Sequence, residues 1–194
     1  MTNYANRGMQ LEEFVEYANA RYRHHGIAVV EKQHTHFIPI RNRYGKIVNC
    51  KVEQKATVDF MGRYRNIPVA IEAKNTNSNR IRFSEVKDHQ AQFLDDFIGE
   101  NGLGFGAVLV SFSMQRFFLV PWQFWKCGRE NWKLMKGKGR GKAIGIYGMS
   151  WETPSKASVS ADELLPEWEV KPNNKYGLAY LSKIDTYINN YVKE

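Results

Sequence analysis

Two short segments near the middle of the chain constrain its fold most strongly. Residues Ala56–Met61 and Pro68–Lys74 are strand-like, and a turn-prone stretch separates them, so they predict an antiparallel hairpin. The first segment carries Asp59, and the second carries Glu72 and Lys74. Because side chains alternate along a strand, Glu72 and Lys74 project from the same face. Pairing of the two strands would bring both carboxylates into one pocket.

The same alternation divides the other hairpin residues between two faces. Thr57 is expected to share the face of Asp59, and the opposite, apolar face is predicted to hold Val58, Phe60, Ile71 and Ala73. Two acids and a lysine at this spacing also occur by chance on strands that face solvent. Ordinary surface residues are therefore the alternative to a catalytic group.

A pocket of two carboxylates has the chemistry of a Mg²⁺ site. Mg²⁺ keeps several waters and typically binds one or two carboxylates together with substrate phosphate oxygens, and Mn²⁺ is the expected substitute. The ion would polarise a scissile phosphate, help to generate hydroxide and stabilise the leaving oxygen. Lys74 would lie beside the attacking water or counter the charge that develops on the phosphate.

The rest of the chain predicts one α/β domain over residues 1–194, with a central mixed sheet flanked by helices. Strands are expected over Ile27–Glu31, Phe105–Ser113 and Arg116–Val120. Helices are expected from Leu11 to near Gly26, from a Ser84 cap to before Asn101, from Pro121 through a Trp-rich segment, and over Leu178–Val192. The Trp-rich segment is assigned to packing, with base stacking as the alternative.

The charge of the chain favours a polyanionic partner. It contains 28 Lys and Arg against 20 Asp and Glu, a formal net charge of +8. Residues 37–56 are predicted to form an inserted, protruding arm that follows DNA phosphates through Arg41, Arg43, Lys46, Lys51 and Lys55. Arg7, Arg80 and Arg82 are further candidates for DNA binding, and the basic stretch 136–142 would add phosphate affinity. For Arg80, Arg82 and that stretch, a solvated basic surface is the alternative.

Two helices offer further candidate site residues. Glu12 lies beside the apolar stripe of the first helix, where it could reach the edge of the sheet, and Glu13 is the competing choice. Gln90 falls on the apolar face of the second helix, so it needs a hydrogen-bond partner. That partner is either a group near the metal-bound water or the DNA backbone, or a backbone carbonyl in the core.

Four short motifs occur in order along the chain: Asn6-Arg7-Gly8-Met9 followed by Leu11-Glu12, then Gln54 to Asp59 with Gly62, then Glu72-Ala73-Lys74, and finally Asp88-His89-Gln90. In this order they resemble the RecU family of Holliday junction resolvases, which belong to the PD-(D/E)xK nucleases. The resemblance covers roughly the first two thirds of the chain. The arm departs from the family pattern at residues 41–45.

The resemblance implies an endonuclease that makes symmetric paired nicks in four-way DNA junctions and leaves 5′-phosphate ends. It implies Asp59, Glu72 and Lys74 as metal and catalytic positions, with Thr57 nearby as a further metal ligand and Glu12 supplied from the first helix. It also implies a stalk that enters the DNA-binding cleft, a homodimer, and a RecA-type recombinase as a partner. Paired cuts on opposed strands fit two active sites related by a two-fold axis.

Two alternative hypotheses for the same residues differ in substrate or in chemistry. One is another PD-(D/E)xK endonuclease, of restriction or nicking type, and a second is a noncatalytic DNA-binding recombination factor. The two cysteines, Cys50 and Cys127, have no spacing typical of zinc or of a disulfide framework, and no long apolar segment predicts membrane insertion. A cytoplasmic protein is expected.

Overall fold

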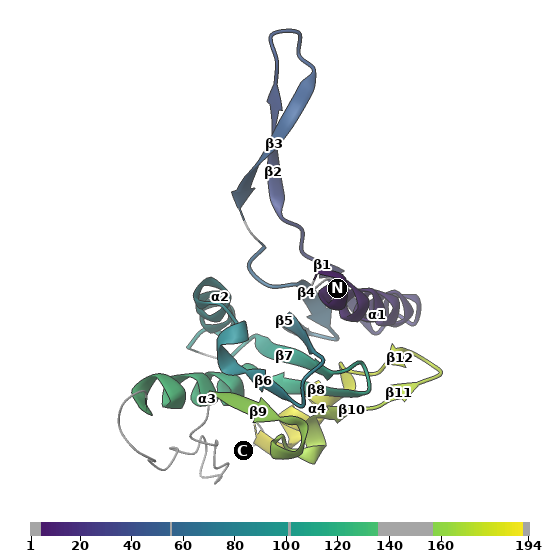
Figure 1. Ribbon diagram of the computed structural model, residues 1–194. Helices are drawn as coiled ribbons and strands as arrows, with labels where there is room; N and C mark the ends of the chain where they lie inside the picture. Colours follow the sequence, from purple (N-terminus) through teal and green to yellow (C-terminus); the bar gives the residue numbers. More distant parts are fainter. Residues whose placement is uncertain (1–4, 55, 101, 136–156, 192–194) are drawn as a thin grey trace.

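The computed structural model describes residues 5–54, 56–100, 102–135 and 157–191 and has a six-stranded sheet at its centre (Figure 1). The strand order is β1 (Ala28–Lys32), β4 (Phe60–Tyr64), β5 (Ile67–Thr76), β7 (Phe105–Phe112), β8 (Arg116–Pro121) and β10 (Glu169–Val170). Strands β5 and β7 are parallel, and the other neighbours are antiparallel. The predicted α/β fold with a mixed sheet is confirmed.

Helices cover both faces of this sheet. Helix α1 (Ala5–His24) and helix α4 (Ser182–Tyr191) pack on one face, and helices α2 (Asp88–Ile98) and α3 (Trp122–Met135) pack on the other (Figure 1). Strand β5 contributes Ile71 to the first core and Ala70 to the second. Because the strand is covered on both faces, its apolar run is nearly continuous.

The predicted hairpin exists, but its limits were predicted wrongly. Strands β4 and β5 pair with Phe60 opposite Ile71, whereas Thr57, Val58 and Asp59 form a bend before β4. Val58 consequently packs in the α2 core and Phe60 in the α1 core, so the prediction that both lie on one face is wrong. Strand alternation does not apply to residues in a bend.

The predicted turn is shorter than expected, because Gly62 belongs to the strand. Only Arg65 and Asn66 form the turn, and Arg65 has a φ of 51°. A Cβ at Gly62 would lie 2.0 Å from the carbonyl oxygen of Val29 on β1. The glycine is therefore required by the close approach of β1 and not by a turn.

The arm is a two-stranded antiparallel ribbon that projects from the body of the protein (Figure 1). Strand β2 (His36–Arg41) pairs with β3 (Ile47–Gln54). The ribbon leaves the sheet after β1 and returns at the bend before β4. The described side chains of both strands are exposed, and they include Phe37, Ile38 and Val48.

Three helix boundaries differ from the predicted ones. Helix α1 begins at Ala5, more than one and a half turns earlier than Leu11. Ser84 caps no helix, because Phe83–Glu85 is a separate 3-10 turn and α2 begins at Asp88. Helix α4 begins at Ser182, since Leu178 pairs in a short strand. The Trp-rich helix α3 is confirmed, with Trp122 and Trp125 fully buried, which supports the packing role.

Several short C-terminal elements were not predicted. Strand β9 (Ser158–Ser160) pairs with β6 (Arg80–Arg82), and strands β11 (Pro172–Asn173) and β12 (Gly177–Leu178) form a small hairpin. Elements of two or three residues contain too few positions to show a periodic pattern. The basic stretch 136–142 lies outside the described residues. None of the helices described here is long and apolar enough to cross a membrane.

Candidate active site

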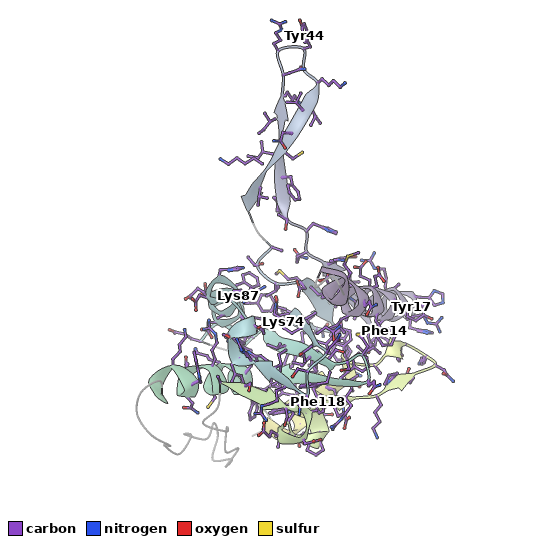
Figure 2. All side chains as sticks on the ribbon, in the orientation of Figure 1. Phe14, Tyr17, Tyr44, Lys74, Lys87 and Phe118 are labelled. Carbon is purple, nitrogen blue, oxygen red and sulfur yellow. The ribbon has the colours of Figure 1, made fainter. Side chains whose placement is uncertain are left out.

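A pocket of about 600 Å³ opens at the end of β5, between α1, β6 and α2. The structure brings seven of the predicted site residues to its wall: Glu12, Asp59, Glu72, Lys74, Arg80, Arg82 and Gln90. Figure 2 shows Lys74 within the body of the protein, below the base of the arm. Thr57 does not line this pocket, because it lies at the start of the bend.

Glu72 lies at the centre of the site and is 0% exposed. Its strand β5 lies inside the sheet and is covered by packed helices on both faces. One carboxylate oxygen, Oε1, accepts a hydrogen bond of 2.7 Å from Nε2 of Gln90 and one from Nζ of Lys74. The other oxygen, Oε2, has no hydrogen-bond partner among the described residues. A buried, unpaired carboxylate oxygen is costly unless a cation or water binds it.

Asp59 approaches Glu72 from the bend that precedes the neighbouring strand β4. Its Oδ2 accepts a hydrogen bond of 2.8 Å from the backbone N–H of Ala73, which follows Glu72 on β5. Its backbone carbonyl accepts a hydrogen bond of 2.8 Å from the N–H of Gln33, at the base of the arm. These two backbone contacts fix the bend, so the Asp59 carboxylate is held without support from regular strand pairing.

The surroundings of the two carboxylates raise the pKa of each of them. Burial raises the pKa of Glu72 to about 7, and the charge of Asp59 acts in the same direction, whereas Lys74 opposes it. Burial also raises the pKa of Asp59, against the Ala73 N–H and Lys74. Two acids that resist ionisation together are typical of a site that binds a positive charge between them.

This donor set fits a divalent cation that prefers oxygen. The site offers two carboxylates, one of them with a free oxygen, and opens to a pocket that can admit water and a phosphate. Across the described part of the chain, no cluster of three or more His, Cys, Asp and Glu side chains could hold a metal. Two carboxylate donors are the ligands that an ion such as Mg²⁺ takes from a protein, and it completes its shell with water and substrate oxygens.

Helix α1 supplies a third acid to the pocket. Glu12 lines the wall, whereas Glu13 is exposed on the helix and does not. Lys32, the last residue of β1, holds the Glu12 carboxylate through Nζ at 3.0 Å and the Glu16 carboxylate at 2.6 Å. Sequence reasoning missed Lys32, because only the packing of β1 against α1 brings it to these acids. The sequence contains no local signal for that contact.

Gln90 connects the start of α2 to the buried acid. Its Oε1 accepts a hydrogen bond of 2.9 Å from the N–H of Lys87, and its Nε2 donates to Glu72. The side-chain amide N–H of Gln90 thus has the Glu72 carboxylate as its partner, and not the backbone carbonyl that was the alternative. The amide satisfies one helix-terminal N–H and one carboxylate oxygen at once.

We expect Gln90→Ala to lower the free energy of unfolding by about 1–2 kcal/mol, because it removes a helix cap and a hydrogen bond to a buried carboxylate. Urea denaturation of the metal-free protein measures this change. Gln92→Ala is the matched control, since Gln92 is exposed two residues further along α2 and its side chain donates to Asp96. Equal stability of the two variants would contradict the role given to Gln90.

The predicted DNA-binding residues fall into two groups. Arg80 and Arg82 line the pocket, whereas Arg41, Arg43, Lys46 and Lys51 are exposed on the arm. Arg41 donates to the carbonyl of Gly45, and the guanidinium of Arg43 stacks over the Tyr44 ring, at the tip of the arm in Figure 2. Arg7 lies in the first turn of α1, with its side chain outside the described part, and Lys55 lies outside the described residues.

Comparison with known proteins places these features in a family. A family model described as RecU, recombination protein U, matches residues 6–186. Two relatives named Holliday junction resolvase RecU, from Streptococcus pneumoniae (strain Taiwan19F-14) and Streptococcus oralis, are each 33% identical over 126 residues. The match covers 61% of this chain and 63% of each relative, so it spans less than two thirds of their length. The chain belongs to the RecU family.

Proposed function

We propose that this protein is a metal-dependent endonuclease of the PD-(D/E)xK type that cuts Holliday junctions. The observation that carries the proposal is the buried Glu72 carboxylate, with one oxygen unpaired, between Asp59 and Lys74 on the wall of an open pocket. Two relatives that match this chain carry the name Holliday junction resolvase, which supports branched DNA as the substrate.

Each residue of the site has a separate task in this proposal. Asp59 and the free oxygen of Glu72 hold Mg²⁺ or Mn²⁺, which when bound supplies Lewis acidity toward the scissile phosphate and lowers the pKa of a water. Lys74 places a positive charge where the phosphate gains negative charge during attack. Gln90 holds the Glu72 side chain in one orientation, and Glu12 completes the acidic wall from α1. We assign Thr57 at most a supporting place, since it lies off the pocket wall.

The arm is proposed to bind the phosphates of the junction. Residues 37–56 are proposed as an inserted element of the one nuclease domain, and the described basic side chains among them are exposed and can follow a DNA backbone. Contacts of this kind position DNA without reading its sequence, so selection of a junction comes from branched shape.

Lys46→Ala combined with Lys51→Ala should weaken junction binding about tenfold at physiological salt and reduce the slope of log K against log salt by roughly 2, because each lysine neutralises about one phosphate. Binding is measured in the Asp59→Asn background, where no cleavage occurs. Lys171→Ala with Lys175→Ala, beside the β11–β12 hairpin, removes the same charge elsewhere. Equal losses in both pairs would attribute binding to net charge and contradict the role of the arm.

A homodimer follows from the symmetry of the substrate. A four-way junction has approximate two-fold symmetry, and two active sites at fixed spacing can cut opposed strands in concert. A junction labelled in turn on each strand tests this point. Symmetric nicks on two opposed strands, sealed by DNA ligase without prior treatment, are the expected result and identify 5′-phosphate ends. A single cut per junction, or ends that ligase cannot seal, would contradict the proposal.

A further inference from the structure

The C-terminal part of the chain reaches the wall of the active-site pocket through Arg80. Arg80 lies on β6, which pairs with β9, a strand that begins 78 residues later in the sequence. In this pairing Arg80 lies opposite Ser160. Arg80 lines the pocket, whereas Ser158 and Glu163 do not. The two C-terminal residues therefore contact Arg80 without forming part of the pocket wall.

The guanidinium is held along one edge by three hydrogen bonds. Its Nε donates to Oγ of Ser158 at 3.0 Å, and its Nη2 donates to the Ser158 carbonyl at 2.6 Å and to Oε2 of Glu163 at 2.7 Å. The remaining nitrogen, Nη1, has no hydrogen-bond partner in the part of the chain that the structure describes. An arginine fixed along one edge presents its other edge in a defined direction.

Glu163 is itself held in place. Its Oε2 also accepts a hydrogen bond of 2.9 Å from the N–H of Ser160. Burial acts to raise the pKa of Glu163, but the Ser160 N–H and Arg80 outweigh it and lower the pKa to about 2. The carboxylate is therefore charged at any pH at which the protein is assayed, and the Arg80–Glu163 pair is 30% and 28% exposed.

The backbone of Arg80 is positioned from the other side by the end of β5. Oγ1 of Thr76 accepts from the N–H of Ser78, and Oγ of Ser78 accepts from the N–H of Arg80 at 3.3 Å. Thr76 and Ser78 both line the pocket. The strand that carries Glu72 and Lys74 is thus linked to Arg80 by a short, hydrogen-bonded connection.

We propose that Glu163 and Ser158 are positioning residues that aim Arg80 at a phosphate of the DNA bound in the active-site pocket. This inference rests on the proposed function, since it concerns the same site. Glu163 cancels part of the charge of Arg80, so it contributes orientation more than affinity. Loss of Glu163 should accordingly lower kcat and leave KM nearly unchanged.

The experiment compares Glu163→Gln with Asp162→Asn on a four-way junction. Asp162 is the matched control, because it is the adjacent acid, its side chain is 88% exposed and it pairs with Arg116. We expect Glu163→Gln to lower kcat about tenfold, the loss that a small misplacement of a binding group causes, with KM within about twofold. Asp162→Asn should leave both constants at the wild-type value.

A double-mutant cycle separates positioning from a general structural effect. Arg80→Gln should lower kcat at least as much as Glu163→Gln does, and the double variant should cut no more slowly than Arg80→Gln. If Glu163→Gln unfolds the protein, Ser158→Ala replaces it in the cycle. We expect Ser158→Ala to lower kcat about two- to threefold, because it weakens one orienting contact. This loss of kcat should be absent in the Arg80→Gln background.

The outcomes distinguish this inference from the proposed function. Suppose that the wild type cuts junctions but Glu163→Gln has the same kcat as Asp162→Asn, or that the losses of kcat caused by Glu163→Gln and Arg80→Gln multiply in the double variant. In either case the positioning role is wrong and the nuclease proposal stands. If the wild type cuts no junction, both fall together.

Discussion

Glu72→Gln is expected to abolish junction cleavage and, at the same time, to stabilise the metal-free protein at alkaline pH. The neutral amide cannot hold a divalent cation as a carboxylate does, so the cleavage rate should fall by about 10³-fold or more. The same substitution removes a buried charge that the fold disfavours, because Glu72 is fully buried beside Asp59. Loss of activity with gain of stability is the trade-off expected when a strained active-site charge is removed.

The sign of the stability effect follows from the pKa of Glu72. The folded protein raises this pKa from its ordinary value of 4.5 to about 7, so folding favours the protonated form. The corresponding stability is fully present below about pH 4.5 and is lost as the pH rises through about 7. The loss amounts to on the order of 3 kcal/mol, or roughly 6–12 °C in Tm for a chain of this size.

Thermal melting with EDTA at pH 5 and pH 8 measures the effect. Wild type should lose stability between the two values relative to Glu72→Gln, and added Mg²⁺ should restore part of that loss only in the wild type. Glu85→Gln is the control, since Glu85 is an exposed acid on the rim of the same pocket. A lower Tm for Glu72→Gln than for wild type at pH 8 would show that the buried carboxylate is not an electrostatic burden on the metal-free fold.

Lys74→Met should have the second largest effect, and it should fall on the chemical step. Lys74 pairs with Glu72 and faces the pocket, and its unbranched methionine replacement keeps most of the volume of the side chain. We expect the single-turnover cleavage rate to fall by about 10²- to 10³-fold, the usual effect of removing one group that stabilises developing charge. Junction affinity should change little, because one lysine among many contributes little to binding.

Lys87→Met is the matched control for this variant. Lys87 is exposed just before the start of α2, outside the pocket wall, and Figure 2 labels it next to that helix. It should cut junctions at the wild-type rate. If Lys74→Met binds junctions weakly but cuts the bound ones at the normal rate, Lys74 serves binding and the assignment to chemistry is wrong.

The sequence was sufficient to predict the pairing of β4 with β5, because β-branched runs and a short connection determine it locally. It also indicated the acids, since a charged Glu72 inside an apolar run is unusual for a strand covered on both faces. It could not show that Asp59 lies in a bend. The alternation of polar and apolar residues continues through residues 57–59, and the strand is interrupted there because the arm returns to the sheet at this point.

Contacts between distant segments were beyond sequence reasoning. Lys32 reaches Glu12 because β1 packs against α1, and Glu163 reaches Arg80 because β9 pairs with β6. Neither contact has a local pattern, and a three-residue strand such as β9 has almost no propensity signal. The residues that position a site were therefore harder to predict than the residues that form its centre.

Cleavage of a four-way junction by the wild type and by Asp59→Asn, in Mg²⁺ or in EDTA, tests the proposed activity most directly. Linear duplex and fork substrates of matching sequence are the controls. We expect paired symmetric cuts in the junction alone, only with Mg²⁺ and only with Asp59 intact. Equal cutting of plain duplex would contradict junction selectivity and indicate another nuclease. Tight junction binding without any cleavage that depends on Asp59 would contradict the proposal that the protein is an enzyme.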